Sequence, residues 1–370
     1  MTADQVAERL RGSDGPVRIA GAGTKANWGN PIDAGDALSM TELDAIVEHN
    51  AGDLTAVVEA GVTLARLREE LAEHGQMFAL DPPGDAATIG GIVATGDSGP
   101  LRHRYGGPRD LVLGVTVALP DGSVAKAGGK VIKNVAGYDL SKLMTGGFGT
   151  LGVVARVALR LHPLPRETVT AYGETDDPEE LARVARAASH AHFEPIALDY
   201  DWRGHQGWVY VRFGGVDAEA QAQAARDLLA EAGADANLTH ADEELWREQA
   251  LRQRSDDGTV VRVSHTQSQL EQLLGMTSLE GASVVGRVAL GVSWFTLRHK
   301  EPADVASAVR DMRKRLAPAA CVILDAPAEV RSLVDPWGIG DGPELTLMRR
   351  TKDLFDPRGV CNRGIYVAGI

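Results

Sequence analysis

The segment Pro82–Gly99, PPGDAATIGGIVATGDSG, decides the fold of the N-terminal half of this chain. Its small residues lie on both sides of one apolar pair, Ile92-Val93. The two large side chains can anchor the segment in a core, while the small ones let a flat ligand approach the backbone. Thr88, Thr95 and Ser98 add hydroxyl groups that can donate hydrogen bonds to phosphate or sugar-alcohol oxygens. This composition predicts a binding loop, and a glycine-rich surface loop is the alternative.

The first glycine loop along the chain, Gly21-Ala22-Gly23-Thr24-Lys25, directly follows the short apolar segment Val17–Ala20, which reads as a strand, and Pro82–Gly99 is the second glycine segment. Successive backbone N–H groups in such a turn can hold a phosphate. The dinucleotide fingerprint GxGxxG fails because Ala26 occupies its sixth position. The segment 27–31, NWGNP, would also break the helix that such a site requires. A Rossmann-type NAD site is therefore disfavoured, and an ordinary glycine turn remains open.

A third glycine turn, GGFGTLGVV at Gly146–Val154, leads into the apolar run Leu151–Leu161, which reads as a buried strand. Backbone groups at the mouth of this turn can bind an adenine edge. A plain turn before a core strand is the alternative.

In this order and spacing, the three segments resemble the FAD-binding domain of the vanillyl-alcohol oxidase (PCMH-type) flavoproteins, over residues 15–162. The family pattern is a strand and a glycine loop for the pyrophosphate, then P-x-x-x-x-x-T-I-G-G-x-x-A-T, then G-T-L-G-V for the adenosine end. Related 2-hydroxy-acid dehydrogenases read G-S-E-G-T-L-G, and here Phe148 replaces the acidic residue. The resemblance implies FAD contacts at Gly21, Ala22, Gly23, Thr24, Lys25, Pro83, Gly84, Thr88, Gly90, Gly91, Ala94, Thr95, Ser98, Gly99, Gly149, Gly152 and Val154.

The resemblance also implies that FAD is bound noncovalently. Covalent relatives attach the flavin to a His in the first loop, or to a Cys or His elsewhere. Here the first loop carries Thr24 and Lys25, and His103 is the nearest other histidine. We interpret His103 as a surface residue.

Two further stretches resemble the FAD-binding subunits of glycolate oxidases: GGKVIKNVAGYDLSKLM at 128–144 and FDPRGVCN at 355–362. The resemblance implies a catalytic flavoprotein subunit and an iron–sulfur subunit as partners, and a small 2-hydroxy acid as substrate. By chemistry alone, Lys130 and Lys133 can oppose phosphates or an anionic substrate. Asn134 and Tyr138 can donate hydrogen bonds near a ring system. A solvated basic strand and a core tyrosine are the alternative.

No catalytic residue and no metal ligand can be assigned from the sequence. Catalytic 2-hydroxy-acid relatives carry an H-G-H…G-D-G-N metal pattern, which this chain lacks; its one HxH is His190-Ala191-His192. Three functions remain. The first is an FAD subunit of a glycolate oxidase complex, which oxidises glycolate to glyoxylate and passes electrons to an iron–sulfur partner. The second is a stand-alone FAD-dependent dehydrogenase or oxidase of a small hydroxy acid or alcohol. The third is a scaffold that has lost its flavin. The missing metal pattern favours the first.

Composition excludes several other classes of function. The net charge of −13 disfavours nucleic acid as a partner. No apolar run approaches the roughly 18 residues of a membrane span, and the N-terminus, MTADQVAERLRG, does not read as a signal peptide. We therefore expect a cytoplasmic protein, which partners could hold at the inner face of the membrane. Cys321 and Cys361 form no CxxC pair, so they do not build an iron–sulfur or zinc site alone. We expect reduced thiols, with a single disulfide as the alternative.

The expected fold class is α+β. Residues 1–165 should form a PCMH-type FAD-binding domain of two α+β subdomains, and residues 166–345 an antiparallel-sheet cap domain. Residues 346–370 should return to the FAD domain. Thr41 and Asp44 resemble a capping box and predict a helix that runs to about Asn50. The apolar run 284–297 predicts one long strand.

Overall fold

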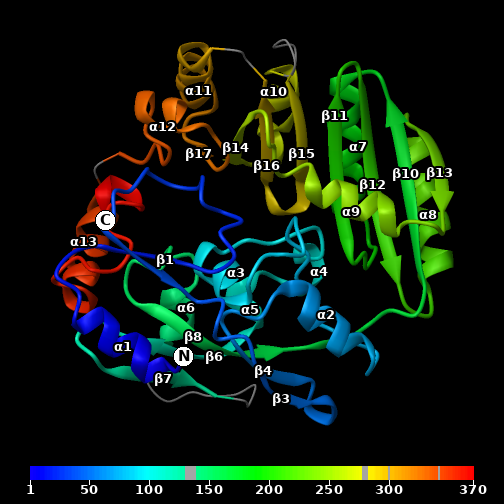
Figure 1. Cartoon of the computed structure of the whole chain (residues 1–370). Coiled ribbons are helices and arrows are strands. Elements are labelled where there is room, and N and C mark those ends of the chain that lie inside the picture. Colours follow the sequence, from blue (N-terminus) through cyan, green and yellow to red (C-terminus); the bar gives the residue numbers. More distant parts are fainter. Residues whose placement is uncertain (130–138, 277–281, 299–300, 341) are drawn as a thin grey trace. The chain divides into compact units, whose positions relative to one another are not determined.

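The computed structural model of the chain describes residues 1–129, 139–276, 282–298, 301–340 and 342–370 (Figure 1). Lys130, Lys133, Asn134 and Tyr138 lie outside the described residues. The chain divides into two compact units. Unit 1 comprises Met1–Ser98, Gly106–Leu164 and Ile339–Ile370; unit 2 comprises Gly99–Tyr105 and Pro165–Gly338.

Unit 1 is built on an antiparallel sheet of order β3-β4-β8-β6-β7. Its central strand, β8, is almost wholly buried, as the apolar run in the sequence predicted. β1 and β2 form a separate parallel pair, and β5 pairs with β9. The strands are β1 (Val17–Ala20), β2 (Asp36–Ser39), β3 (Ile46–Asn50), β4 (Thr55–Glu59), β5 (Gln76–Met77), β6 (Val112–Ala118), β7 (Val124–Gly128), β8 (Val153–Arg160) and β9 (His162–Pro163).

The longer helices of unit 1 follow from caps and apolar spacing. In α2, Thr63 caps the first turn, and Leu64, Leu67 and Leu71 form the buried face. The first helix, α1, begins with a capping box between Thr2 and Gln5. The helices are α1 (Ala3–Arg11), α2 (Leu64–Ala72), α3 (Ile89–Thr95), α5 (Pro108–Leu111), α6 (Leu140–Met144) and α13 (Pro343–Phe355).

The predicted helix between Thr41 and Asn50 is wrong. Residues Ile46–Asn50 form strand β3, which pairs antiparallel with β4. The neighbouring β-branched residues Ile46 and Val47 favour a strand, and the ladder with β4 supplies hydrogen bonds that a helix of a few residues could not match. Tertiary pairing therefore overrides a local capping pattern.

Unit 2 is an antiparallel sheet of order β13-β10-β12-β11-β15-β16-β14-β17. One core cluster joins buried residues of α7, α8, α10 and α11 to side chains of the sheet, so these helices cover one face. The strands are β10 (Thr168–Thr175), β11 (Ala197–Arg203), β12 (Gln206–Gly214), β13 (Asp235–Thr239), β14 (Thr259–Ser264), β15 (Ser283–Arg287), β16 (Val292–Leu297) and β17 (Ala320–Ile323). The helices are α4 (Arg102–Tyr105), α7 (Pro178–His190), α8 (Ala218–Glu231), α9 (Glu243–Leu251), α10 (Leu270–Gly275), α11 (Pro302–Leu316) and α12 (Ala328–Leu333).

The predicted single strand at 284–297 is two strands. A short 3-10 turn, Val288–Leu290, and Gly291, with φ of +60°, reverse the chain between β15 and β16. A φ of +60° is strained for most residues that carry a side chain, so position 291 favours glycine. The extended conformation of the apolar run is interrupted there. The helix α9 and the strand β13 had no sequence prediction. The α+β class with an antiparallel second half is confirmed.

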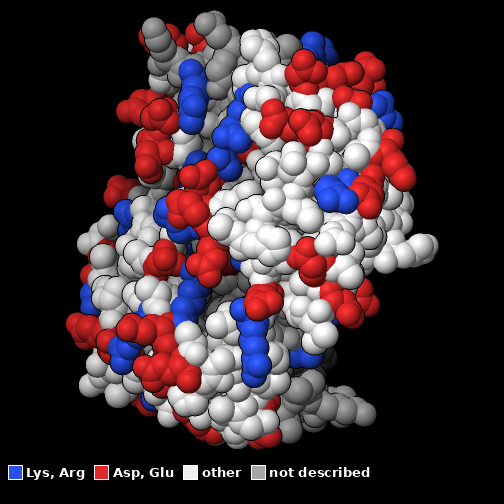
Figure 2. Space-filling view, turned by 90° about the vertical axis from the view of Figure 1, so that its right-hand side faces the viewer, with Lys and Arg blue, Asp and Glu red and all other residues white. Residues whose placement is uncertain are grey.

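The surface is acidic but mixed. On the face drawn in Figure 2, basic and acidic side chains are interspersed between uncharged areas, with no broad basic patch. Within the part of the chain that the structure describes, no helix is both long enough and apolar enough to cross a membrane.

Candidate functional site

The first two glycine segments touch each other in unit 1. A Cβ added to Gly21 would lie 2.0 Å from Oγ1 of Thr88, so position 21 has no room for a side chain. Thr88 also caps α3, because its Oγ1 accepts a hydrogen bond of 3.3 Å from the Gly91 N–H. The backbone of the loop after β1 is therefore packed against a side chain at the start of α3.

The third glycine turn is bonded to the end of the second segment. Gly146 N donates to Val93 O at 3.0 Å, and Phe148 N donates to Ala94 O at 2.8 Å. These acceptors lie in the last turn of α3, where carbonyls have no partner inside the helix. The end of a seven-residue helix thus positions the turn that leads into β8.

One side chain from the far end of the sequence joins the first and third segments. Asn362 Oδ1 accepts from Ile19 N at 2.7 Å, and its Nδ2 donates to Phe148 O at 2.8 Å and to Ile19 O at 3.3 Å. Asn362 is 5% exposed and has a φ of +41°, a conformation that asparagine tolerates better than most residues. The sequence pattern placed this residue in a motif but gave it no role.

The turn that carries Asn362 is itself fixed by buried charges. Lys352 Nζ donates to Thr150 O at 2.6 Å, to Cys361 O at 3.1 Å and to Asp356 Oδ2 at 2.7 Å. Asp356 also accepts from the backbone N–H groups of Val360 and Cys361. Burial raises the pKa of the Cys361 thiol to about 12, so it stays protonated and takes no part in thiolate chemistry.

The glycines of the three segments fall into two groups. A Cβ at Gly90 would lie 2.6 Å from Ala60 Cβ, and one at Gly152 would lie 3.0 Å from Ala118 O, so packing explains both. At Gly23, Gly84 and Gly146, no atom of the described residues lies within 4 Å of an added Cβ.

Gly91 differs from both groups. An added Cβ would meet only Thr88 Oγ1, at 3.1 Å, and the residue lies in the regular helix α3. The helical backbone does not demand a glycine here, and the tight contact involves one side-chain atom of Thr88. At Gly23, Gly84 and Gly146 a positive φ, of +74°, +88° and +77°, itself favours glycine, and the space beside these three residues is compatible with a large cofactor held against the backbone.

Lys25 makes a contact that its sequence did not predict. Its Nζ lies 3.1 Å from Asp97 Oδ2, and both side chains are only 6% exposed. It also lies 5.8 Å from the ring centroid of Trp28. The ion pair connects the first loop to the end of the second segment and offsets the positive charge of Lys25.

The predicted hydroxyl donors are used differently. Thr95 Oγ1 donates to Gly91 O at 2.7 Å, so its hydroxyl proton is already hydrogen-bonded within α3. Thr88 Oγ1 accepts the cap hydrogen bond of α3, and the bond of 2.9 Å from Ser98 to Asp97 Oδ1 comes from the Ser98 backbone N–H rather than from its hydroxyl group. Gly99 belongs to unit 2 and is not grouped with the other positions. Within unit 1, Ala22 is exposed, Pro83 and Val154 are buried, and Gly149 lies beside Asn362.

Phe148, which departs from the acidic residue of the pattern, has a packing role. Its backbone is left-handed, with φ of +54°, and its ring is 9% exposed. The ring centroid lies 6.5 Å from that of Trp28 and 5.6 Å from that of Tyr366. This aromatic cluster joins the first loop, the third turn and the C-terminal segment by apolar contact.

Comparisons with known proteins identify the relatives of this chain. A family model described as an FAD binding domain matches residues 2–128. The chain is 33% identical over 252 residues to glycolate oxidase subunit GlcE of Escherichia coli K12, covering 67% of this chain and 68% of that protein. It is 39% identical over 153 residues to the mitochondrial D-lactate dehydrogenase (cytochrome) of Arabidopsis thaliana, of which it covers 27%.

A solved structure shares the fold. Alkyldihydroxyacetonephosphate synthase superposes with a TM-score of 0.72 over 97% of this chain and 73% of that one, at 13% identity. At this identity the likeness concerns architecture alone. The architecture nonetheless covers almost the whole chain, and the family model, described as an FAD binding domain, implies FAD as the cofactor.

Proposed function

Because this chain belongs to the PCMH-type FAD-binding family of FAD-linked oxidoreductases, we propose that it is the FAD-binding subunit of a glycolate oxidase complex. In this complex glycolate is oxidised to glyoxylate, and electrons pass on to an iron–sulfur partner. The observation that carries the proposal is the extent of the match to GlcE. A match of 252 residues cannot fit within the first 165, so it includes part of the second half of the chain.

FAD, when bound, supplies the two-electron redox chemistry, and the chain supplies position and charge. The residues proposed to hold FAD, without a covalent bond, are those of the three segments, and the open space beside Gly23 and Gly84 supports their role. Phe148 and Asn362 keep the segments together, and the buried pair of Lys25 and Asp97 closes the first loop on the second.

The cysteine count supports partners. The chain has two cysteines, whereas an iron–sulfur cluster is usually held by four cysteine thiolates. A cluster that takes electrons from this flavin therefore has to reside on another chain. GlcE is named as a subunit, and GlcD of Bacillus subtilis is 31% identical to this chain over 187 residues. We propose a catalytic flavoprotein subunit as the second partner.

The experiment that tests the proposal uses the purified, FAD-loaded chain without oxygen. We expect glycolate or D-lactate alone to leave the visible flavin absorbance unchanged. Adding the catalytic flavoprotein subunit together with glycolate should then bleach it. Rapid bleaching by either acid alone would instead identify a stand-alone dehydrogenase, the function that the similarity to D-lactate dehydrogenases supports.

The same preparation separates both functions from a non-catalytic scaffold. A flavin subunit should be purified yellow, or should take up one FAD per chain when FAD is added. A folded but colourless protein that does not bind added FAD would contradict the proposal and leave the scaffold function.

A further inference from the structure

One segment from the far end of the sequence, Asn362–Tyr366, holds the first glycine loop at both of its ends. Before the loop, Ile19 N donates to the side chain of Asn362 at 2.7 Å. After the loop, Asn30 N donates to a backbone carbonyl of the same segment at 2.9 Å. Residues 20–29 lie between these two anchors, so their conformation depends on how firmly the anchors are fixed.

The second anchor, Asn30, is bonded to three consecutive carbonyl groups. Its backbone N–H donates to Ile365 O, and its side-chain Nδ2 donates to Gly364 O at 3.0 Å and to Tyr366 O at 2.9 Å. Only a side chain with two donors on one nitrogen can make both side-chain bonds, and aspartate, which has the same size, has none when ionised. Asn30 therefore fixes both the position and the direction of the chain as it leaves the loop.

The segment that receives these bonds is itself anchored in unit 1. Asp356, which is 1% exposed, accepts from the backbone N–H groups of Val360 and Cys361 at 2.9 and 2.8 Å. Cys361 also forms a parallel bridge with Val17 of β1. On the other side of the segment, the side chain of Val367 is buried. The segment thus forms a fixed support to which the loop is attached.

The two halves of the loop are held from different places. The first half meets the second glycine segment, because Gly21 packs on Thr88 and Lys25 pairs with Asp97. The second half ends at Asn30 and is held from the far end of the sequence. Each half has its own support, so loss of the Asn30 contacts should loosen the second half without unfolding the first.

A loop of this kind can bind a phosphate through backbone N–H groups only when these groups point toward one place. If the loop has to be ordered during binding, the entropic cost of ordering lowers the affinity for the ligand. A residue that fixes an end of the loop therefore strengthens binding without contacting the ligand, in the way that supporting residues hold the direct contacts of a functional site.

We propose that Asn30 is a positioning residue for FAD, because it docks the first glycine loop on Asn362–Tyr366 and holds the loop in the arrangement that binds the pyrophosphate. This inference rests on the proposed function, in which the glycine segments hold FAD. Linkage requires the converse effect as well. Bound FAD stabilises the docking of the loop on this segment by the same factor by which docking strengthens FAD binding.

Asn30→Asp tests the proposal in the full-length chain. The variant keeps the size and the backbone N–H of Asn30, but it loses both Nδ2 donors and places a carboxylate against two carbonyl oxygens. In the flavin-free chain, we expect hydrogen–deuterium exchange of residues 23–30 to become at least about tenfold faster, while β8 exchanges as before. Fluorescence titration should show that FAD binds at least about tenfold more weakly.

Gln76→Glu is the matched control. Gln76 is also a buried amide of unit 1, and its Nε2 donates to Ala51 O at 2.8 Å, so the control replaces the same kind of donor by a carboxylate. The control should lower thermal stability and leave both loop exchange and FAD affinity unchanged. Asn30→Ala removes the donors without adding a charge. It should shift both quantities in the same direction as Asn30→Asp, and it provides the test if the aspartate variant does not fold.

Three outcomes would overturn the proposal. Exchange of residues 23–30 that is unchanged in the Asn30 variants would mean that this asparagine does not hold the loop. Faster exchange with unchanged FAD affinity would mean that the docked loop is not needed for FAD. Equal losses of FAD affinity in Asn30→Asp and Gln76→Glu would show an effect of stability alone. A failure of the proposed function differs from all three, because the unmodified chain itself would then bind no FAD and both statements would be wrong.

Discussion

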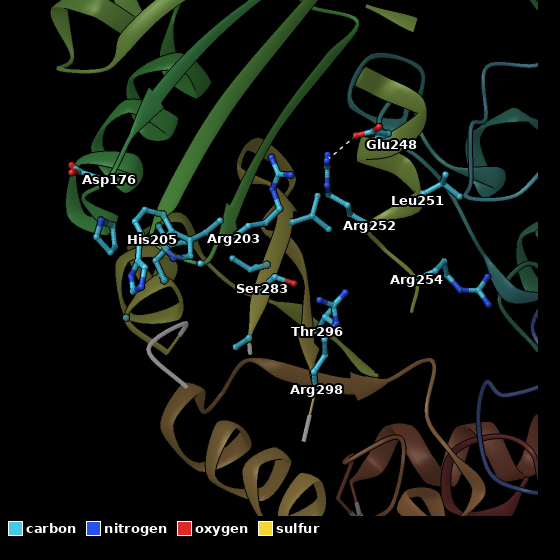
Figure 3. A pocket seen from close by; sticks show the side chains of 18 residues that line it. Asp176, Arg203, His205, Glu248, Leu251, Arg252, Arg254, Ser283, Thr296 and Arg298 are labelled. Carbon is cyan, nitrogen blue, oxygen red and sulfur yellow. Dashed lines mark hydrogen bonds and ion pairs between the residues drawn. The ribbon is translucent and has the colours of Figure 1, made fainter. Parts of the chain in front are cut away.

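The glycine segments of unit 1 and the two arginines around buried Asp201 in unit 2 are built from different parts of the chain. In unit 1 the proposed contact surface is backbone, at Gly23 and Gly84, where no described atom lies within 4 Å of an added Cβ, and at Gly91 in α3. In unit 2 two long side chains, Arg203 and Arg252 (Figure 3), are oriented by the buried carboxylate. The glycine segments depend on the absence of side chains, and the arginines around Asp201 depend on charged side chains.

This difference determines which mutations should matter. A backbone site is sensitive to added side chains and to the contacts that hold its segments together. A cluster of charged side chains is sensitive to the loss of charge. Substitutions in unit 1 should therefore alter the contacts between segments, and a substitution in unit 2 should alter a charge.

Asn362→Asp should have the larger effect. Aspartate keeps the acceptor for Ile19 N and tolerates the left-handed backbone, but loses the donor to Phe148 O. A buried carbonyl without its partner costs about 1–3 kcal/mol, so FAD should bind about tenfold more weakly. Quenching of flavin fluorescence on titration measures this, well below the unfolding temperature of the apoprotein.

Arg358→Gln is the control for that variant. Arg358 lies in the same C-terminal turn, but its guanidinium donates to Leu10 O and Pro120 O rather than to the glycine segments. The control should lower thermal stability and leave FAD affinity unchanged. If both variants weaken FAD binding in proportion to their loss of stability, Asn362 has no specific positioning role.

A smaller effect is expected from Asp201 in unit 2. Burial raises the pKa of this carboxyl from its ordinary 3.8 to about 6, even though Arg203 and Arg252 oppose the shift. The folded state therefore binds a proton that the unfolded chain releases between about pH 4 and 6. Ionisation of Asp201 costs stability at pH 7, and this cost disappears as the pH falls through 6 toward 4.

Chemical denaturation between pH 7 and pH 5 tests this prediction, with Asp201→Asn as comparison. The difference in unfolding free energy between the chain and the variant should change by about 1 kcal/mol or more over this interval. A difference independent of pH would mean that Asp201 stays ionised throughout and that its arginines dominate over burial.

The glycine segments could be predicted from the sequence because their signal is local. Gly21, Thr88 and Gly91 each lie in a short pattern whose order along the chain matches a family, and the structure brings the segments together. The partner of Lys25 could not be predicted in this way. Asp97 lies within the quoted segment, but no spacing rule joins a loop residue to another seventy positions away.

The role of Asn362 and the cavity of unit 2 depend on contacts that are long-range in sequence. Asn362 bonds to Ile19 across nearly the whole chain. In unit 2, residues of β11, α9 and β16 line one cavity, and α9 had no sequence prediction. The failed helix before Asn50 has the same cause, because its strand is stabilised by pairing with β4.

The FAD content of Gly91→Val tests the central claim most directly. An added Cβ at position 91 meets only Thr88 Oγ1, at 3.1 Å, and the residue lies in a regular helix, so the variant should fold after a small shift of Thr88. Gly15→Val, at a glycine outside the three segments where no described atom lies within 4 Å of an added Cβ, is the control. We predict that Gly91→Val unfolds at the same temperature as the flavin-free unmodified chain but loses most of its FAD, while Gly15→Val keeps it. A folded Gly91→Val protein with one FAD per chain would contradict the placement of the cofactor on these segments.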